Sequence, residues 1–153
     1  PLPEAQLDRF LMQINVDYPD RATERRILLG TTGTEDIAVE RIADADALTE
    51  LQRLVRSLPV GESVVEAILD LVARARPAPE HPEIIWGPGP RAAQALMLGV
   101  RARAMLDGRV APSVDDVRAL AGPVLRHRMA LGFAARADGQ TVDGLVDSLT
   151  REM

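Results

Sequence analysis

Arg91 is the residue in this sequence best placed to bind an anion. It follows the rigid turn Gly87-Pro88-Gly89-Pro90, in which Pro90 suits the first position of a helix because proline lacks the N–H that would be unpaired there. Arg91 would then lie in the first helical turn, where the macrodipole is positive and free N–H groups point outward. A helix N-terminus with an arginine suits a phosphate oxygen. A solvated surface arginine explains the same residues, so both interpretations are open at this point.

Other residue patterns that indicate catalysis are missing from the sequence. All 18 basic residues are arginine, so there is no glycine-rich phosphate loop ending in lysine. His81 and His127 lack the spacing of a metal site, and Ser113 has no nearby histidine partner. Asp115 and Asp116 would lie in the first turn of a helix, where the dipole favours acidic groups, so we interpret them as structural. The chain is therefore not expected to be a self-contained catalyst.

The composition indicates a globular, mainly α protein with an acidic surface. The chain has 153 residues, of which 46% are hydrophobic and 27% charged, enough for a real core. Aromatic residues make up only 3%, so the core must be aliphatic, which favours packed helices. The net charge of −5 argues against nucleic acid as a partner. The pairs Arg101/Arg103 and Arg126/Arg128 lie among carboxylates, and we interpret them as solvated faces or partner contacts.

The sequence also bears on location and completeness. There is no cysteine, which is consistent with a reducing cytoplasm. No apolar run approaches membrane-spanning length and no signal peptide is evident, so we expect a cytoplasmic protein without a membrane span. The chain starts at Pro1 without methionine, and we expect it to be a fragment of a longer protein.

Helical periodicity dominates from Asp20 onward. Asp20 and Thr141 are expected N-caps, and Ser113 with Asp116 approximates a capping box. Pro123 should bend or break its helix after Ala121. We expect six helices. The first runs from Asp20 to Leu29, the fourth from Pro90 to Leu106, where Asp107-Gly108 ends it, and the fifth begins at Ser113. The apolar faces of the other three are Leu48, Leu51, Val55 and Leu58 on the second, Val65, Ile68, Leu69 and Val72 on the third, and Val142, Leu145, Val146 and Leu149 on the last, which follows Thr141.

The remaining stretches are expected to be loops, with one exception. Residues 31–42, 77–90 and 132–140 are predicted as loops, and the long proline-rich connection 77–90 is expected to be functional or mobile. The segment from Met12 to Tyr18 alternates apolar and polar residues, which predicts a strand. A single strand is not stable alone, so this one fits a cut through a larger sheet domain. We therefore divide the chain into residues 1–18, the edge of such a domain, and residues 19–153, a helical domain.

Several motifs of this chain together resemble a known family. The segment from Pro1 to Phe10 resembles the part of MoxR-type AAA+ ATPases that closes the nucleotide-binding core. Four later segments resemble the family's C-terminal lid, in the same order and at similar spacing. They are Gly87-Pro88-Gly89-Pro90-Arg91-Ala92, Asp107-Gly108-Arg109, Val114-Asp115-Asp116-Val117 and Val124-Leu125-Arg126-His127-Arg128. The resemblance implies an AAA+ helical lid bundle preceded by a short extended tail left over from the ATPase core. Gly89 departs from the family, which more often has a small hydroxyl residue or alanine there.

The resemblance also implies roles for two arginines. Arg9 matches the arginine finger, which reaches the nucleotide of a neighbouring subunit in a ring. Arg91 matches the sensor-2 arginine, which contacts the γ-phosphate and couples lid position to nucleotide state. Whether Arg91 acts on its own subunit's nucleotide or on a neighbour's is open at this point. The implied ligands are ATP and Mg²⁺, and no metal ligand is assigned to this chain.

The implied function belongs to a larger assembly. The lid would work with its own AAA+ core and with neighbouring subunits of a homo-oligomeric ring, with a hexamer as the expected state. ATP hydrolysis there drives remodelling or maturation of a protein client, for which a metal-dependent adhesion-site domain protein is one candidate. Without the core, this chain should be inactive and hold no ATP or Mg²⁺. The alternative is a free-standing acidic helical module that binds a partner helix in a groove, and the presence of an ATPase core upstream in the reading frame would discriminate the two.

Overall fold

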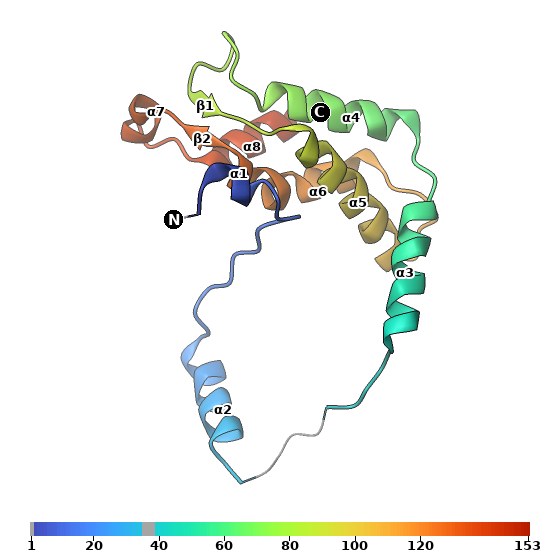
Figure 1. Ribbon diagram of the computed structural model, residues 1–153. Coiled ribbons are helices and arrows are strands. Elements are labelled where there is room, and N and C mark those ends of the chain that lie inside the picture. The colour runs from blue at the N-terminus through green and yellow to red at the C-terminus, as the bar shows by residue number, and fades with distance from the viewer. Residues whose placement is uncertain (1, 35–38) are drawn as a thin grey trace.

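The computed structural model describes residues 2–34 and 39–153, which form a helical bundle with a long arm projecting from it (Figure 1). The bundle contains α4 (Glu62–Arg74), α5 (Pro90–Leu106), α6 (Val114–Leu125) and α8 (Val142–Arg151). The predicted mainly α fold is confirmed. The other elements are α1 (Glu4–Leu7), α2 (Arg21–Thr31), α3 (Ala45–Ser57), the 3₁₀ helix η1 (Arg126–Arg128), α7 (Phe133–Ala137) and the strands β1 (Ile84–Trp86) and β2 (Ala130–Leu131).

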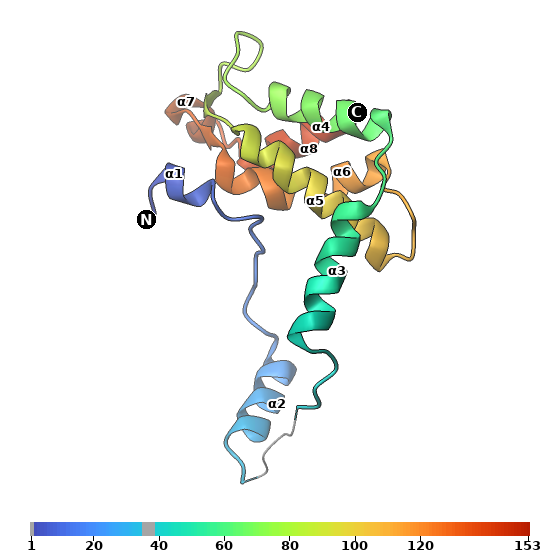
Figure 2. The same cartoon turned by 45° about the vertical axis from the view of Figure 1, so that its right-hand side comes forward.

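An aliphatic core lies between the four bundle helices. α5 packs against α6 and α4, and α8 packs against α6 (Figure 2). The buried face of α4 differs from the predicted one, because Val64 and Leu71 are buried whereas Leu69 is half exposed. The buried aliphatic residues include Val64, Ile68, Leu71, Val72, Leu96, Val100, Val117, Ala121, Val124, Leu125, Val146 and Leu149.

A short antiparallel pair, β1 with β2, closes one end of the bundle. Ile84 pairs with Leu131, and both side chains are buried. The chain then passes very close to the end of α4 at Gly87, where a Cβ atom would lie 2.6 Å from the carbonyl oxygen of Ala75. Only glycine fits this approach, which brings the turn before α5 into place.

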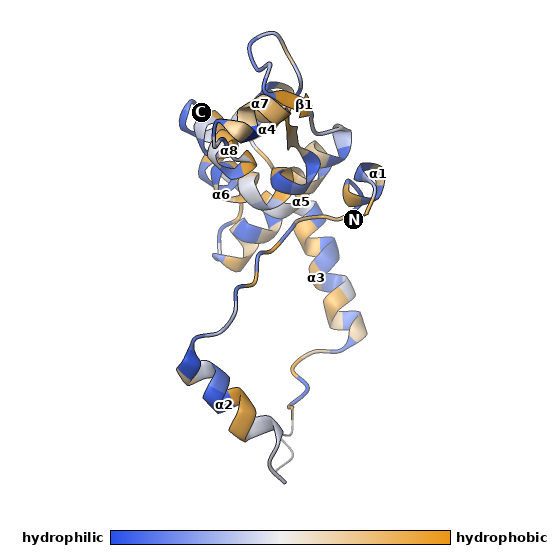
Figure 3. Ribbon diagram, turned by 90° about the vertical axis from the view of Figure 1, so that its left-hand side faces the viewer, coloured by the Kyte–Doolittle hydropathy of each residue, from blue (hydrophilic) through white to orange (hydrophobic). Residues whose placement is uncertain are grey.

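The arm consists of α2, α3 and the segments that connect them to the bundle. In Figures 1 and 2, α2 lies farthest from the bundle, and α3 leads back to it. No residue of α2 or α3 is buried. Figure 3 shows apolar residues along both helices, and Leu48, Leu51 and Leu54 of α3 are each about half exposed. The apolar face that the sequence predicts for α3 is present, but the described residues leave most of it uncovered.

The predicted strand at residues 12–18 is wrong. These residues form no regular secondary structure, and no strand in the described part of the chain pairs with them. Ile14, Val16 and Tyr18 are almost fully exposed. Alternating apolar residues favour a strand only where a second strand supplies hydrogen bonds and a surface to cover them. The division of the chain at residue 18 stays a prediction.

Local signals at helix ends are confirmed. Thr23 donates its backbone N–H to the Asp20 carboxylate at 2.7 Å, and Gly144 donates to the Thr141 hydroxyl at 3.1 Å. α5 begins at Pro90 and ends before Asp107, after which Gly108 has a φ of 71°. This left-handed conformation suits glycine and ends the helix. α2 continues through Gly30 to Thr31, whereas the sequence predicts that this helix ends at Leu29.

Pro123 does not break α6, so the predicted break is wrong, while the alternative prediction, a bend in the helix, is not tested. The helix continues to Leu125 and passes into η1. Val117, Ala121, Val124 and Leu125 are all buried on this helix, and their packing outweighs the hydrogen bond that proline cannot donate. The Pro123 carbonyl also accepts a hydrogen bond from the backbone N–H of Gln13 at 2.8 Å.

Two of the predicted loops contain regular structure. β1 lies within residues 77–90, and residues 132–140 contain the short helix α7. Both depend on contacts between distant parts of the chain, such as the hydrogen bond from Gly132 N–H to the Glu83 carbonyl at 2.8 Å. In the third predicted loop, residues 32–34 and 39–42 have no helix or strand, while residues 35–38 lie outside the described residues.

Candidate phosphate-binding site

Arg91 occupies the first turn of α5, as the sequence predicts. Gly89 is the N-cap residue and Pro90 the first helical residue, so the direction of the helix is set by the turn that Gly87 brings against α4. The Arg91 side chain is 53% exposed and carries its guanidinium beyond the positive end of the helix. A guanidinium placed there adds a full charge and planar N–H donors to the partial charge of the helix terminus, which favours an anion.

Arg9 lies in the turn that follows α1, formed by residues 8–10. Its side chain is exposed, and no ion pair joins it to another residue in residues 2–34 and 39–153. The residue beside it, Asp8, faces the bundle instead. Its carboxylate lies 3.6 Å from an Arg91 nitrogen and 3.0 Å from Nε of Arg128.

These residues line one surface hollow. It has a volume of about 190 Å³ and is bordered by Asp8, Arg9, Arg91, Gln94 and Arg128, with Phe10, Leu11, Ala95 and Leu98 as apolar wall. The lining contains three arginines and one carboxylate, so the net charge of the lining residues is positive. Arg9 and Arg91 are far apart in sequence, and only the packing of the α1 turn against α5 brings them together. The hollow is suited to an anion with several oxygen atoms, such as a phosphate group.

The burial of Arg128 contradicts its interpretation as a solvated or partner-facing residue. It is only 1% exposed and donates to the Asp8 carboxylate and to the carbonyls of Asp8, Phe10, Leu11 and Val124. A signal for its burial exists in the sequence, because Arg128 continues the apolar stripe of Val117, Ala121 and Val124 at helical spacing. A charge on an apolar stripe needs several hydrogen-bond acceptors, and all of them except the Val124 carbonyl come from residues 8–11, near the opposite end of the chain.

His127 beside it is also buried. Its Nε2 lies 3.2 Å from the Phe10 carbonyl oxygen, so the neutral ring donates there, while its Nδ1 has no hydrogen-bond partner among the described residues. Burial lowers the pKa of His127, and the nearby Arg128 charge lowers it further. His127 is thus held neutral and adds a second contact between η1 and the turn that carries Arg9.

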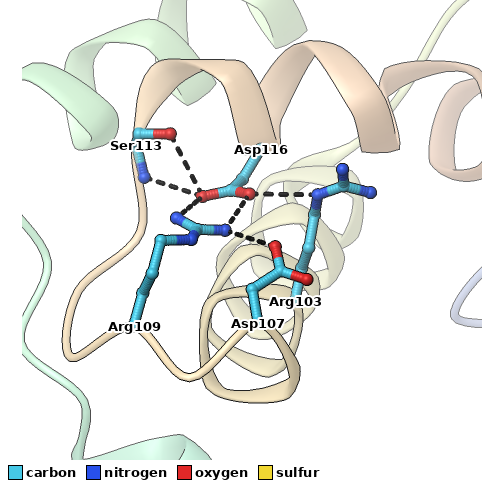
Figure 4. Close-up of polar contacts among 5 residues, drawn as sticks. All are labelled: Arg103, Asp107, Arg109, Ser113 and Asp116. Carbon is cyan, nitrogen blue, oxygen red and sulfur yellow. Dashed lines mark hydrogen bonds and ion pairs between the residues drawn. The ribbon is translucent and has the colours of Figure 1, made fainter.

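Another group with a clearly shifted pKa, Asp116, is structural. Figure 4 shows its carboxylate between Arg109, which donates at 2.7 and 2.8 Å, and Arg103, which donates at 3.1 Å. Ser113 donates its backbone N–H to the same carboxylate at 2.8 Å, the acidic half of the predicted capping box. The Arg109 hydrogen bonds hold the pKa of Asp116 at about 2. This cluster joins the end of α5 to the start of α6, away from the hollow.

Other kinds of site find little support. In the described ranges, no group of three or more His, Asp or Glu residues could hold a metal ion, so these residues do not fit a Mg²⁺ site. No helix among them is long and apolar enough to cross a membrane. A larger apolar groove of about 630 Å³ runs between α3 and α5, bordered by Leu11, Val55, Leu98, Leu106 and Leu120 among others. It contains neither Arg9 nor Arg91.

The fold and the hollow define a helical module in which three arginines line one surface hollow. Comparisons with known proteins agree with that class. The family model of the AAA lid domain matches residues 66–149, and the chain belongs to this family.

Named relatives extend the match to almost the whole chain. The chain is 34% identical over 95% of its length to the uncharacterized protein YeaC of Bacillus subtilis, covering 45% of that protein. It is 33% identical over 90% of its length to chaperone MoxR1 of Mycobacterium tuberculosis, covering 38%. The crystal structure of a candidate ATPase from Cytophaga hutchinsonii superposes with a TM-score of 0.91 at 27% identity, over 100% of this chain and 48% of the other.

The resemblance to the lid of MoxR-type AAA+ ATPases is therefore confirmed. The chain spans less than half the length of these relatives. The roles of Arg9 and Arg91 are not tested by these matches and stay predictions.

Proposed function

We propose that this chain is the part of a MoxR-type AAA+ ATPase that senses and completes the nucleotide site, in a protein that couples ATP binding and hydrolysis to the remodelling or maturation of protein partners. The observation that carries the proposal is the hollow shared by Arg9 and Arg91. Arg9 is exposed and free to reach outward, and Arg91 projects from a helix N-terminus. Both positions suit contact with phosphate oxygens.

In the proposed mechanism, Arg9 acts as an arginine finger on the ATP of a neighbouring subunit. The transferring γ-phosphoryl group accumulates charge on its oxygens, and a guanidinium stabilises that charge. Arg91 acts as the sensor-2 residue. Since both side chains border one hollow of about 190 Å³, we propose that they address the same nucleotide, so Arg91 also acts across the subunit boundary.

Asp8 gives this site a resting state. Its carboxylate lies 3.6 Å from Arg91, so a phosphate that binds Arg91 replaces an internal anion. The lid can thereby respond to the presence of the γ-phosphate. Mg²⁺ would neutralise phosphate charge when bound with ATP, and we assign its ligands to residues outside this chain.

The wider setting is proposed from the family resemblance. We propose a homo-oligomeric ring, with a hexamer as the expected state, located in the cytoplasm, and a protein client such as a metal-dependent adhesion-site domain protein. The chaperone designation of the Mycobacterium tuberculosis relative supports a role in acting on other proteins. This chain alone is expected to hydrolyse no ATP.

Subunit mixing tests the proposal. In the full-length protein, Arg9→Ala should lower kcat for ATP by about 10³-fold, because arginine fingers supplied in trans have effects of at least that size. Mixing Arg9→Ala subunits with subunits inactivated in their phosphate loop should restore part of the activity, since mixed interfaces pair an intact finger with an intact site. Arg118→Ala, which removes an exposed arginine that pairs with the exposed Asp115, is the control. Absence of restoration would contradict action in trans.

A second candidate function is a free-standing acidic module that binds a partner helix. The apolar groove of about 630 Å³ and the uncovered leucines of α3 favour it. Under this function the Arg9→Ala and Arg91→Ala proteins would behave like the wild type in every assay of nucleotide turnover. An ATPase core upstream in the reading frame would exclude it.

A further inference from the structure

We propose that Arg128 is a positioning residue that fixes the turn carrying Arg9 to the helical bundle, so that Arg9 and Arg91 move as one unit. This inference rests on the proposed function of Arg9. Arg128 does not itself contact the nucleotide. Its role is to hold Arg9 in position.

Arg128 donates hydrogen bonds in several directions to the turn that carries Arg9. Nε donates to the Asp8 carboxylate at 3.0 Å, Nη1 to the Leu11 carbonyl at 3.2 Å, and Nη2 to the Asp8 carbonyl at 3.1 Å and to the Phe10 carbonyl. These acceptors lie on both sides of Arg9. A planar guanidinium that bonds residues on both sides of a turn fixes its position and its orientation together.

Arg128 is also buried. It is 1% exposed, and its Nη1 also donates to the carbonyl of Val124 in α6 at 2.6 Å. A buried arginine is costly unless all its donors are used. The Asp8 carboxylate and the carbonyls of Asp8, Phe10 and Leu11 accept four of its five hydrogen bonds. The turn and the arginine therefore hold each other in place.

Burial of side chains does little to fix this turn. α1 contains only four residues, none of them buried, and Arg9 and Phe10 are exposed. Besides Arg128, the contacts that join this turn to the bundle include His127 to the Phe10 carbonyl at 3.2 Å and Asp8 to Arg91 at 3.6 Å. Loss of the Arg128 contacts should therefore allow Arg9 to move away from its position. A displacement of about 1 Å at a catalytic contact can reduce a rate about 100-fold.

Asp8 links the residue that holds Arg9 to Arg91. Asp8 bonds Arg128 at one carboxylate oxygen and faces Arg91 with the other. Arg91 is on α5, and Arg128 is on η1 at the end of α6. Since α5 and α6 pack closely in the bundle, a movement of the bundle carries Arg9 and Arg91 together.

The test uses Arg128→Lys in the full-length protein, which keeps the charge but not the planar set of donors. We expect kcat for ATP to fall about 10–100-fold while KM for ATP changes less than about threefold, because the variant subunit's own nucleotide site is intact. Arg126→Lys is the matched control. Arg126 lies in the same 3₁₀ helix but pairs with Asp143 at 3.0 Å, so its kcat should equal that of the wild type.

Subunit mixing separates positioning from a general loss of structure. Arg128→Lys subunits mixed with phosphate-loop variants should regain activity as Arg9→Ala subunits do, since the neighbour supplies an intact finger. Adding Arg128→Lys to Arg9→Ala should cause no further loss beyond about twofold, because the finger is already absent. A structural defect would give neither result, and failure of either would overturn the inference.

Asp8→Asn keeps the experiment decisive if Arg128→Lys does not fold. It removes the charge from one anchor of the turn and retains its shape, and we expect a several-fold lower kcat that is absent in the Arg9→Ala background. An unchanged kcat in folded Asp8→Asn protein would then overturn the inference. If Arg9→Ala itself leaves kcat unchanged, the proposed function fails. If Arg9→Ala lowers kcat and the Arg128→Lys and Asp8→Asn proteins match the wild type, only the positioning role fails.

Discussion

The carboxylate of Asp8 lies 3.6 Å from the guanidinium of Arg91, so a residue next to Arg9 and a residue at the start of α5 meet at the rim of one hollow. This ion pair is partly exposed and longer than a direct hydrogen bond, and such pairs add little to stability. Its significance is positional. It places an internal anion where the proposed phosphate would bind.

Replacement of Arg91 should affect hydrolysis much more than folding. In the full-length protein, Arg91→Ala should lower kcat/KM for ATP about 10–100-fold, since a charge-assisted hydrogen bond contributes about 1.5–3 kcal/mol. The free energy of unfolding should change by less than about 1 kcal/mol. Arg91→Lys should restore activity only in part, because it lacks the planar fork. Steady-state kinetics and urea titration measure both effects, and wild-type kinetics in both variants would make Arg91 a plain surface residue.

The two glycines of the turn before α5 should respond in opposite ways to alanine. A Cβ atom on Gly87 would meet the Ala75 carbonyl at 2.6 Å and the Arg76 Cα at 2.8 Å, whereas one on Gly89 meets only an Asp8 oxygen, at 3.9 Å. Gly87→Ala should therefore destabilise the fold by about 1–3 kcal/mol. Gly89→Ala should be neutral, or stabilising by up to about 1 kcal/mol, because Gly89 has an ordinary extended conformation. Thermal unfolding of the two proteins compares them directly, and equal melting temperatures would contradict the packing argument.

Removal of the Asp116 charge should destabilise the junction of α5 and α6. Asp116→Asn loses the charge that Arg109 and Arg103 share, and we expect a loss of about 1.5–3 kcal/mol in the free energy of unfolding. Asp115→Asn is the control, because the Asp115 side chain is 84% exposed and its loss should cost less than about 1 kcal/mol. Chemical denaturation measures both, and similar values for the two would refute the structural role of Asp116.

Asp116 also predicts a loss of stability in acid. Its pKa is about 2 in the folded chain against a normal 3.8, because it accepts hydrogen bonds from Arg109. The unfolded chain binds this proton first, so the contribution is complete above about pH 4 and disappears as the pH falls through about 2. Between pH 5 and pH 2, the free energy of unfolding should decrease less with falling pH in Asp116→Asn than in the wild type. An equal decrease in both proteins would show that other carboxylates determine the acid dependence.

His127 predicts a second pH effect, at milder acidity. Burial lowers its pKa in the folded chain, so the unfolded chain takes up the proton at a higher pH. The stability contributed by the neutral ring is complete above about pH 6.5, the normal value, and decreases as the pH falls below it. His127→Gln can still donate to the Phe10 carbonyl but does not titrate. The difference in unfolding free energy between pH 7.5 and pH 5.5 should be smaller in this variant, and an unchanged difference would place the effect elsewhere.

Much of the fold follows from the order of residues along the chain. The starts of α2, α5, α6 and α8, and the stop at Gly108, agree with the caps and turns that the sequence predicts. Arg91 was also identified from its local position, and Arg9 from a family resemblance. These predictions succeed because a cap or a proline acts through backbone groups within four residues.

The rest was decided by contacts between distant segments. Pro123 stays within a helix because buried neighbours hold it, and residues 12–18 form no strand because the described chain offers them no partner. The burial of Arg128 depends on carbonyl groups near the opposite end of the chain. A local pattern states what a segment can form. The cost of burying a charge, and the placing of Arg9 and Arg91 at one hollow, are settled only when the tertiary structure supplies the other partner.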